Sequence, residues 1–215
     1  MPIDIINTFY SAYDTDNAIK MSAYMKNNFP FLGLPKPKRA ELSKDFLNSK
    51  KKDTAIDWVF VFLCYDKPER EFHYLAIDYL LAVKKLLTAD DISRIEKLIT
   101  TNSWWDSVDS IDTVVADMVL RFPELKSTIL CFANSDNIWL KRIAIDFQLQ
   151  YKDKTDTELL STVIECNLDS KEFFVNKAIG WALREYSKTN KEWVSNFINS
   201  HKLSPLSVRE ASKYI

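Results

Sequence analysis

Apolar residues recur along this chain every three to four positions, which is the period of an amphipathic helix. One such run passes from Phe72 through Ala76 and Tyr79 to Val83, and another occupies residues 92–99. Side chains at this spacing lie on one face of a helix, whereas a half-buried strand would alternate at every second position. The chain contains only two glycines, although strand and hairpin folds need glycine at many turns. The pattern therefore predicts an all-α protein.

Polar residues mark where several of these helices begin. Thr88 and Thr155 are each followed three residues later by a carboxylate, which is the spacing of a capping box, and Ser204 stands immediately before a proline. A hydroxyl at the N-cap accepts a hydrogen bond from a free backbone N–H, and proline is well tolerated at the first helical position. We expect all three residues to be N-caps.

A four-residue pattern repeats along the helices. It occurs as Ala76-Ile77-Asp78-Tyr79, Ala144-Ile145-Asp146-Phe147 and Ala178-Ile179-Gly180-Trp181. The alanines stand 68 and 34 residues apart (144 − 76 and 178 − 144), and a step of 34 from the first reaches Ser110-Ile111-Asp112, a degenerate copy. A period of this length is typical of a helix-pair repeat. We therefore predict a curved α-α superhelix, a HEAT-like repeat solenoid forming one domain over residues 1–215, with a concave face built from one helix of each pair.

The charge of the chain is nearly balanced, with a formal net charge of −1. This excludes a uniformly basic surface of the kind that often covers nucleic-acid-binding proteins. Residues 36–52 differ, because seven Lys or Arg residues face two acidic ones there, a local charge of 7 − 2 = +5. Two interpretations stay open for this segment: a solvated helix face, or a patch that contacts phosphates.

The residues that most often carry metal or nucleophilic chemistry form no pattern here. Cys64, Cys131 and Cys166 are far apart and lie among apolar residues, so we predict that all three are core thiols. His73 and His201 belong to no catalytic or metal-ligand arrangement, and we expect His73 to be a surface or a satisfied core residue. There is no glycine-rich phosphate loop. We expect no metal and no other cofactor.

No stretch of about 18 apolar residues and no apolar run of signal-peptide type occurs in the chain. The sequence therefore predicts a protein with no membrane association, located in the cytoplasm.

Five unusual side chains share one phase of the repeat. Counted from the repeat alanine, Trp105 and Trp139 lie at −5, Arg142 at −2, Asp109 at −1 and Trp181 at +3. At about 100° per residue these offsets fall within an arc of about 140°, and the repeat alanine and isoleucine positions lie outside it. We therefore predict that three successive helices project these side chains to one common side, while the small and aliphatic residues pack between helices.

Simpler explanations exist for each of these residues. A tryptophan is most often core, and Asp109 and Arg142 could merely pair with each other. Ser103 is a candidate N-cap, with Asp106 completing a capping box. Against this, Trp105 and Asp109 are four residues apart on one helix face, which sets an indole beside a carboxylate and suits a developing cation.

Several strings resemble the AlkD family of bacterial DNA glycosylases, in order along essentially the whole chain. The most specific are Trp104-Trp105-Asp106-Ser107-Val108-Asp109-Ser110-Ile111 and Lys177-Ala178-Ile179-Gly180-Trp181. The others occupy residues 24–26, 31–33, 69–72, 136–140 with Arg142, 173–175, 183–186, 205–207 and 209–211. The near-neutral net charge departs from the family and bears on DNA affinity.

The resemblance implies that a concave helical face binds duplex DNA and that the protein releases cationic N3- or N7-alkylated purines, such as 3-methyladenine and 7-methylguanine. The product would be an abasic site, formed without a deep base-flipping pocket. No candidate Schiff-base lysine stands out, so we predict a monofunctional enzyme, and we expect a monomer because one duplex fills the concave face. By the same resemblance, Trp105, Asp109 and Trp181 are the catalytic residues, with Arg142 and Tyr24 at the DNA. The other residues predicted to contact DNA are Lys26, Lys38, Arg39, Trp139, Lys177 and Arg184. A noncatalytic solenoid that binds distorted DNA or a protein partner is the alternative.

Overall fold

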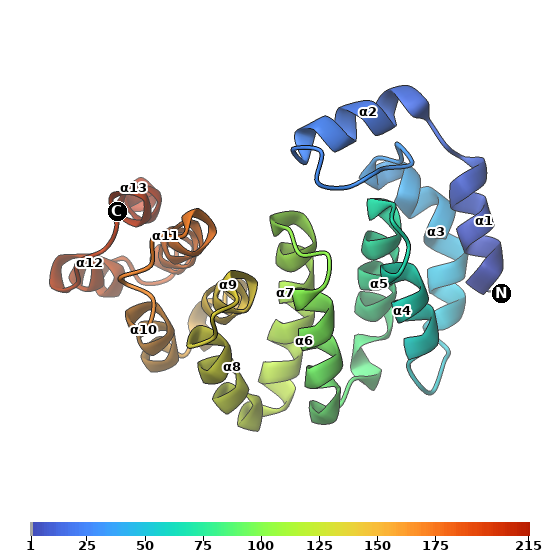
Figure 1. Ribbon diagram of the computed structural model, residues 1–215. Coiled ribbons are helices and arrows are strands. Elements are labelled where there is room, and N and C mark those ends of the chain that lie inside the picture. The colour runs from blue at the N-terminus through green and yellow to red at the C-terminus, as the bar shows by residue number, and fades with distance from the viewer. Residues whose placement is uncertain (1) are drawn as a thin grey trace. The chain divides into compact units, whose positions relative to one another are not determined.

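The computed structural model describes residues 2–215, and their regular structure is entirely helical (Figure 1). Thirteen α-helices and five short 3₁₀ helices occur in this part of the chain, with no strand. The predicted all-α class is thus confirmed. The chain divides into two compact units, one ending at Leu87 and the other comprising residues 88–215. The single domain predicted over residues 1–215 stays a prediction.

The first unit contains five α-helices: α1 (Pro2–Ser11), α2 (Thr15–Tyr24), α3 (Lys36–Lys50), α4 (Trp58–Tyr65) and α5 (Arg70–Val83), followed by a 3₁₀ helix, Lys84–Leu86. The carboxylate of Glu71 ties the segment after α2 to α5, because it accepts the backbone N–H groups of Leu32, Gly33 and Leu34 at 2.9–3.0 Å. Gly33 has φ of +81°, and a Cβ there would lie 2.1 Å from the carbonyl oxygen of Asp14. This turn therefore requires glycine.

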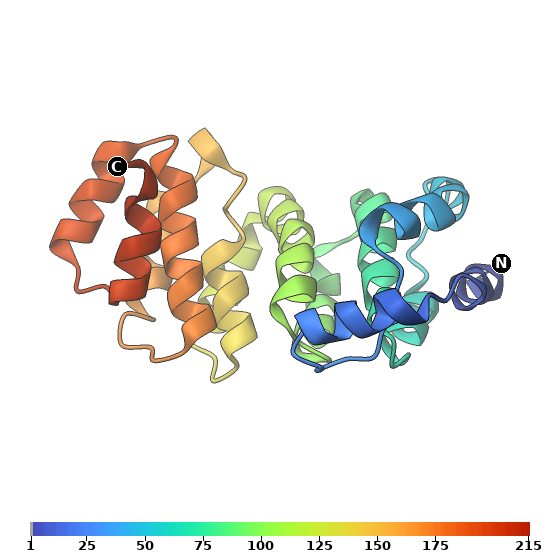
Figure 2. The same cartoon turned by 90° about the horizontal axis from the view of Figure 1, so that it is seen from above.

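The second unit contains eight α-helices: α6 (Ile92–Thr100), α7 (Trp105–Arg121), α8 (Lys126–Ala133), α9 (Ile138–Asp146), α10 (Thr157–Glu165), α11 (Phe173–Ser187), α12 (Lys191–Ser200) and α13 (Pro205–Ala211). Four 3₁₀ helices accompany them: Ala89–Asp91, Pro123–Leu125, Lys152–Lys154 and Ser212–Tyr214. Within this unit α9 contacts α7 on one side and α11 on the other, and α11 contacts α13 (Figure 2).

The predicted helix-pair repeat is present. The repeat positions fall on the second helix of successive pairs, with Ala76 on α5, Ser110 on α7, Ala144 on α9 and Ala178 on α11. The three alanines are fully buried, and each following isoleucine is at most 1% exposed. Small and aliphatic side chains thus pack between helices, as the phase of the pattern predicts.

Two of the predicted N-caps are confirmed. Thr88 forms a capping box with Asp91, although the turn that it begins is a 3₁₀ helix. Ser204 caps α13, where its Oγ accepts the N–H of Ser207 at 3.1 Å.

The other predicted helix starts are wrong. The N-cap of α10 is Asp156 rather than Thr155, because the Asp156 carboxylate lies one residue nearer the helix and accepts the N–H of Leu159 at 3.0 Å. The helix α7 begins one residue later than a Ser103 cap would allow: its N-cap is Trp104, and no side chain caps it. The Ser103 hydroxyl instead donates to the Ile99 carbonyl of the preceding helix, so Ser103 and Asp106 form no capping box.

Gly180 allows α11 and α13 to approach closely. A Cβ at this position would lie 2.5 Å from Cβ of Glu210 and 2.9 Å from the carbonyl oxygen of Ser207. Both atoms belong to the backbone framework of α13 and cannot rotate away. The absence of a side chain at Gly180 therefore determines how near the last helix can lie.

We expect Gly180→Ala to lower the free energy of unfolding by about 1–3 kcal/mol, despite the gain of about 1 kcal/mol in helix propensity that alanine brings. Urea unfolding followed by circular dichroism measures the difference. Thr162→Ala, at an exposed position of α10, is the control for propensity alone and should not destabilise the protein. Unchanged stability of Gly180→Ala would mean that α13 can shift without cost.

Candidate functional site

The hollow of greatest chemical interest lies in the second unit and is formed by α7, α9 and α11. Its volume is about 380 Å³. The residues that line it are Trp105, Asp109, Arg142, Phe173, Phe174, Lys177, Trp181 and Arg184. Six of these eight were predicted from the sequence, including all three expected catalytic residues. Of the five side chains that the repeat offsets assigned to one common side, all but Trp139 line this hollow.

The hollow forms because the second helices of successive repeats direct side chains at equivalent repeat positions toward the same side. Trp105 is the first residue of α7, and Asp109 follows one helical turn later. Arg142 lies one turn into α9, and Trp181 lies in the middle of α11. Since α7, α9 and α11 are neighbours, side chains of one phase converge.

Asp109 and Arg142 form a two-pronged ion pair at this hollow. Arg142 Nε lies 2.7 Å from Asp109 Oδ1, and Nη2 lies 2.9 Å from Oδ2. The remaining guanidinium nitrogen, Nη1, donates to the carbonyl oxygen of Phe174 at 2.9 Å. The simple alternative that these two residues pair is thus confirmed, but the pair borders open space instead of a dry core. Such a planar fork fixes the orientation of the carboxylate as well as its position.

Exposure separates the roles that the two partners can take. The Asp109 side chain is 20% exposed, whereas that of Arg142 is only 4% exposed. All three guanidinium nitrogens of Arg142 already donate within the protein, so its placement favours holding Asp109 over reaching a phosphate. A direct contact of Arg142 with DNA stays a prediction.

The electrostatics of the pair reflect its burial. Burial raises the pKa of Asp109 above its ordinary value, the hydrogen bonds and charge of Arg142 oppose that shift, and the nearby Asp106 adds to it. The pKa of Arg142 is raised although burial alone would lower it, because Asp146 and Asp109 stabilise its charge. A partly desolvated carboxylate in a hollow is a frequent mark of a functional site.

Aromatic rings form the walls. Phe174 lies at the centre of a cluster, with ring centroids 4.9 Å from Trp139 and 5.2 Å from Trp104. Trp139 therefore supports the wall from behind instead of lining the hollow, because its ring packs on Trp104 and Phe174. Phe173 is 59% exposed at the mouth. Its offset from Ala178 is −5, the same offset as the tryptophans of the two preceding repeats, so the repeat itself could have revealed it.

Lys177 and Arg184 converge on one buried carboxylate, Glu210 of α13. Lys177 Nζ lies 2.8 Å from Oε1, and Arg184 Nη1 and Lys213 Nζ lie 2.8 and 2.7 Å from Oε2. Hydrogen bonds from Lys177 and Lys213 lower the pKa of Glu210 to about 2. Three cations on one anion leave an excess of positive charge at this edge of the hollow. Sequence reasoning gave Glu210 no role, although it lies in one of the matching strings.

The remaining predicted DNA contacts belong to the first unit. Tyr24 ends α2 and is 69% exposed, and Lys26 follows in the left-handed conformation with φ of 58°. Lys38 is exposed and pairs with Glu41 at 3.2 Å. Arg39, by contrast, is buried, lies over the ring of Tyr74 and donates to the Leu34 carbonyl, a placement that argues against a phosphate contact.

The basic segment 36–52 comprises α3 and the residues just after it. Five of its seven basic residues are exposed: Lys36, Lys38, Lys44, Lys51 and Lys52. This is compatible both with a solvated helix face and with a phosphate-contacting patch, and the two interpretations stay open.

The thiols and imidazoles give mixed results. Cys64 is buried, and burial raises the pKa of its thiol to about 12. Cys131 and Cys166 are exposed, so the prediction of three core thiols is wrong for two of them: apolar neighbours in a sequence do not tell which face of a helix a residue occupies. His73 is a satisfied core residue, with its ring nitrogens 3.1 Å from Arg70 Nη1 and 2.9 Å from the Lys67 carbonyl oxygen.

Over the part of the chain that the structure describes, no three His, Cys, Asp or Glu side chains are grouped so that they could hold a metal ion. Over the same residues, no helix has both the length and the apolar character that crossing a membrane requires.

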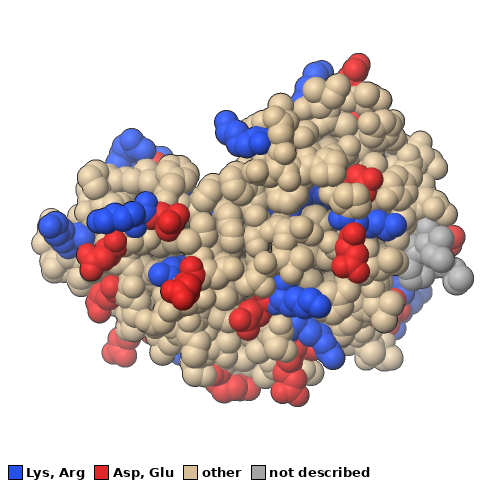
Figure 3. All heavy atoms as spheres, in the orientation of Figure 1, with Lys and Arg blue, Asp and Glu red and all other residues tan. Residues whose placement is uncertain are grey.

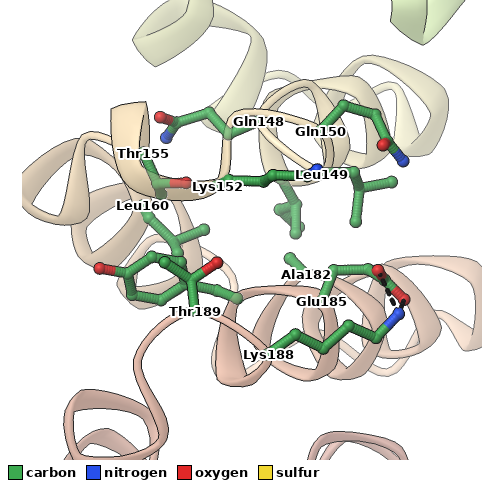
Figure 4. Close-up of a pocket in the computed structure, with 12 residues that line it drawn as sticks. Gln148, Leu149, Gln150, Lys152, Thr155, Leu160, Ala182, Glu185, Lys188 and Thr189 are labelled. Carbon is green, nitrogen blue, oxygen red and sulfur yellow. Dashed lines mark hydrogen bonds and ion pairs between the residues drawn. The ribbon is translucent and has the colours of Figure 1, made fainter.

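A second hollow, of about 290 Å³, lies at the other ends of α9 and α11 (Figure 4). Gln148, Gln150 and Lys152 border it on one side, and Glu185 and Lys188, paired at 2.6 Å, border it on the other. Gln148 is already engaged, because its amide exchanges hydrogen bonds with the backbone of Asp156. The C-terminal ends of α9 and α11 carry partial negative charge. The second hollow also lacks the two features of the first, because neither a tryptophan nor a buried ion pair lines it. The first hollow is therefore the candidate site.

Charge of both signs is mixed over the second unit. Figure 3 shows basic and acidic side chains next to one another over the region of α9 to α13, in keeping with the ion pairs of Glu185 and Glu210. Positive charge near the hollow thus comes from particular side chains and not from a uniformly basic surface.

Comparisons with known proteins show the family to which this chain belongs. The family model described as DNA alkylation repair enzyme matches residues 5–215. Among solved structures, a protein from Enterococcus faecalis described as a predicted DNA alkylation repair enzyme is 37% identical, with a TM-score of 0.88 over 94% of this chain and 96% of its own. A comparison with curated proteins gave no match. The family match spans nearly the whole chain, and the likeness in structure is equally extensive. This chain therefore belongs to the DNA alkylation repair enzyme family.

Proposed function

We propose that this protein is a monofunctional DNA glycosylase that hydrolyses the N-glycosidic bond of N3- or N7-alkylated purines, such as 3-methyladenine and 7-methylguanine, in duplex DNA. The products would be the free base and an abasic site. The observation that carries the proposal is the Asp109 carboxylate, 20% exposed and oriented by Arg142 within a hollow lined by aromatic rings. The AlkD resemblance assigns its catalytic residues to the same place.

The chemistry needs little more than a well-placed negative charge. Alkylation at N3 or N7 makes the purine cationic, so the base leaves readily without protonation by a general acid. As the bond to C1′ breaks, the deoxyribose gains oxocarbenium character, as in glycoside hydrolysis. An opposite charge about 4 Å away contributes about 4 kcal/mol at an effective dielectric constant of 20. Asp109 would stabilise this sugar cation or orient the attacking water.

The aromatic residues would hold the sugar against the carboxylate. Trp105 lines the hollow from the same helix as Asp109, and Trp181 lines it from α11. Each ring face could add about 0.5–2 kcal/mol of cation-π attraction while it excludes water. Phe173 at the mouth offers a further apolar contact. Trp139 would act behind the wall and not at the lesion.

The hollow is open to solvent and not an enclosed cavity, which supports a mechanism without a deep base-flipping pocket. Selection would then depend on the positive charge of the base and not on its outline. Lys177 and Arg184, which share the carboxylate of Glu210 at the edge of the hollow, would contact the flanking phosphates. Such phosphate contacts fix position and not sequence. The Lys177 ammonium is engaged with Glu210, which supports a hydrolytic mechanism over one that uses a lysine Schiff base.

Release of free base from a duplex containing N7-methylguanine tests the proposal. We expect wild-type protein to release this base and to leave a uracil-containing duplex intact, since uracil is neutral. Binding to both duplexes, measured by fluorescence anisotropy, should weaken as the salt concentration rises. Salt-dependent binding without release would favour a noncatalytic DNA-binding solenoid, and the absence of any DNA binding would favour a protein partner.

A further inference from the structure

A second carboxylate lies behind the pair of Asp109 and Arg142. Asp146 follows Arg142 by one turn of α9, and its Oδ2 lies 3.6 Å from Arg142 Nη2. The Asp146 residue is only 2% exposed, and neither of its carboxylate oxygens has a hydrogen-bond partner. Arg142 therefore lies between two carboxylates: Asp109, which borders the hollow, and Asp146, which does not.

A buried carboxylate without hydrogen bonds is costly to a fold and uncommon. Packing alone does not account for it, since an aliphatic side chain of similar volume would fill the space without this cost. Groups of this kind persist most often where a site needs their charge.

The sum of the charges at the hollow gives a reason for a buried carboxylate at Asp146. Asp109 and Arg142 together are neutral, and a neutral pair is a weak stabiliser of a developing cation. An ionised Asp146 would bring the group of three to a net charge of −1. The negative charge at the hollow would then not be cancelled by the residue that orients it.

We propose that Asp146 is a positioning residue for the glycosidic reaction: when ionised it balances the charge of Arg142, so that Asp109 presents an uncompensated negative charge to the sugar. This inference rests on the proposed function. Protonation of Asp146 would leave Arg142 to neutralise Asp109 and would slow base release.

The groups around Asp146 make this a switch near neutral pH. Burial raises the pKa of Asp146 to about 7, Arg142 opposes this shift and Asp109 adds to it. Asp112, on α7, is also buried, and its pKa is raised well above the ordinary value by burial and by Asp146 and Asp109. Burial and Asp112 also keep the Tyr151 hydroxyl neutral by raising its pKa. Among the described residues, Asp146 forms an ion pair with Arg142 alone.

The first test is the pH dependence of single-turnover base release from an N7-methylguanine duplex. For wild-type protein we expect an acid limb with its midpoint near pH 7. Asp146→Asn, which has nearly the same shape, should lose this limb and should be slower at pH 8. We expect a decrease of about 10- to 100-fold, by analogy with the loss of a partner that orients a metal ligand. Asp153→Asn, at an exposed site of the same unit, controls for the change in total charge.

The second test does not depend on activity. The folded-state pKa of Asp146 is raised, so between pH 4 and 7 the folded protein binds more protons than the unfolded chain and loses stability as pH rises. Asp146→Asn should therefore unfold at a higher urea concentration than wild type at pH 8, and the difference should shrink as pH falls toward 4. A merely structural carboxylate would give the opposite sign.

Carbon-13 NMR of the aspartate carboxyl groups in the wild-type protein gives the titration even if the variant does not fold. A midpoint near 7 for the assigned Asp146 carboxyl supports the inference, and an ordinary midpoint near 4 for that carboxyl overturns it. The inference is also overturned if wild type and Asp146→Asn show the same pH profile of base release. Absence of base release by wild type would instead refute the proposed function, while the stability and NMR results would still decide whether Asp146 titrates near neutral pH.

Discussion

Asp109→Asn is expected to lower the rate of base release by about 100-fold or more while DNA affinity changes by less than about threefold. The amide keeps the shape of the carboxylate but removes the charge that would stabilise the sugar cation. The fold should survive, because Arg142 keeps its hydrogen bond to the Phe174 carbonyl and its ion pair with Asp146. Single-turnover kinetics on an N7-methylguanine duplex at low salt measure the rate, and fluorescence anisotropy measures the binding.

Asp117→Asn provides a matched control for this experiment. Asp117 lies on the same helix, α7, but pairs with Arg121 at 2.8 Å, and it does not line the hollow. The control should release base at a rate close to that of wild type, since partly exposed pairs of this kind contribute only about 0–1 kcal/mol. Loss of binding together with release in Asp109→Asn would assign Asp109 to DNA recognition. Full activity of Asp109→Asn would remove the carboxylate from the mechanism.

The helical period was enough to predict which residues converge. The repeat of about 34 residues gave each side chain a phase, and Asp109, Arg142 and Trp181 meet in one hollow because equivalent helices are neighbours in the second unit. The same rule extends to Phe173, which shares the offset of Trp105. The sequence therefore predicted the side to which a side chain points wherever that side depends only on its position in the repeat.

Contacts that depend on distant helices could not be read in this way. Arg184 and Glu210 are 26 residues apart, and they meet only because Gly180 admits α13 against α11. Trp139 shares the phase of Trp105 but turns into the wall, because Trp104 and Phe174 offer it aromatic contacts. Phase predicts the direction of a side chain, whereas its contacts depend on how neighbouring helices pack.

The third position of the repeat pattern holds an aspartate in three copies. Asp78, Asp112 and Asp146 occupy it, and burial raises the pKa of each. In the fourth copy Gly180 takes this place, and the carboxylate near it is Glu210 from α13. The sequence showed this recurrence but gave no sign that Asp112 and Asp146 are buried near Arg142, or that Asp78 lies near Arg39 instead. These placements depend on how the helices pack.

Arg142→Met should lower the free energy of unfolding by about 3–5 kcal/mol at pH 8, the usual cost of removing one partner of a buried ion pair. Methionine keeps much of the apolar volume of the side chain but leaves Asp109 and Asp146 without their shared cation. Arg142 lowers the pKa of both carboxyl groups, so its loss raises both. The two unpaired carboxylate charges destabilise the fold most at high pH. We therefore expect the deficit in stability to be smaller at pH 5 than at pH 8, because a larger fraction of these carboxyl groups is protonated at the lower pH. Urea unfolding at the two pH values measures this.

Arg142→Lys and the double variant Arg142→Met with Asp146→Asn separate charge from geometry. Lysine keeps the charge but cannot form the two-pronged contact, so it should retain part of the stability at pH 8 and lose most of the base release. The double variant should recover stability at pH 8, because one of the two unpaired charges is gone. A deficit of equal size at both pH values would instead assign it to lost packing and to the hydrogen bond with the Phe174 carbonyl. In that case Arg142 would support the start of α11 and would not control the charge of Asp109.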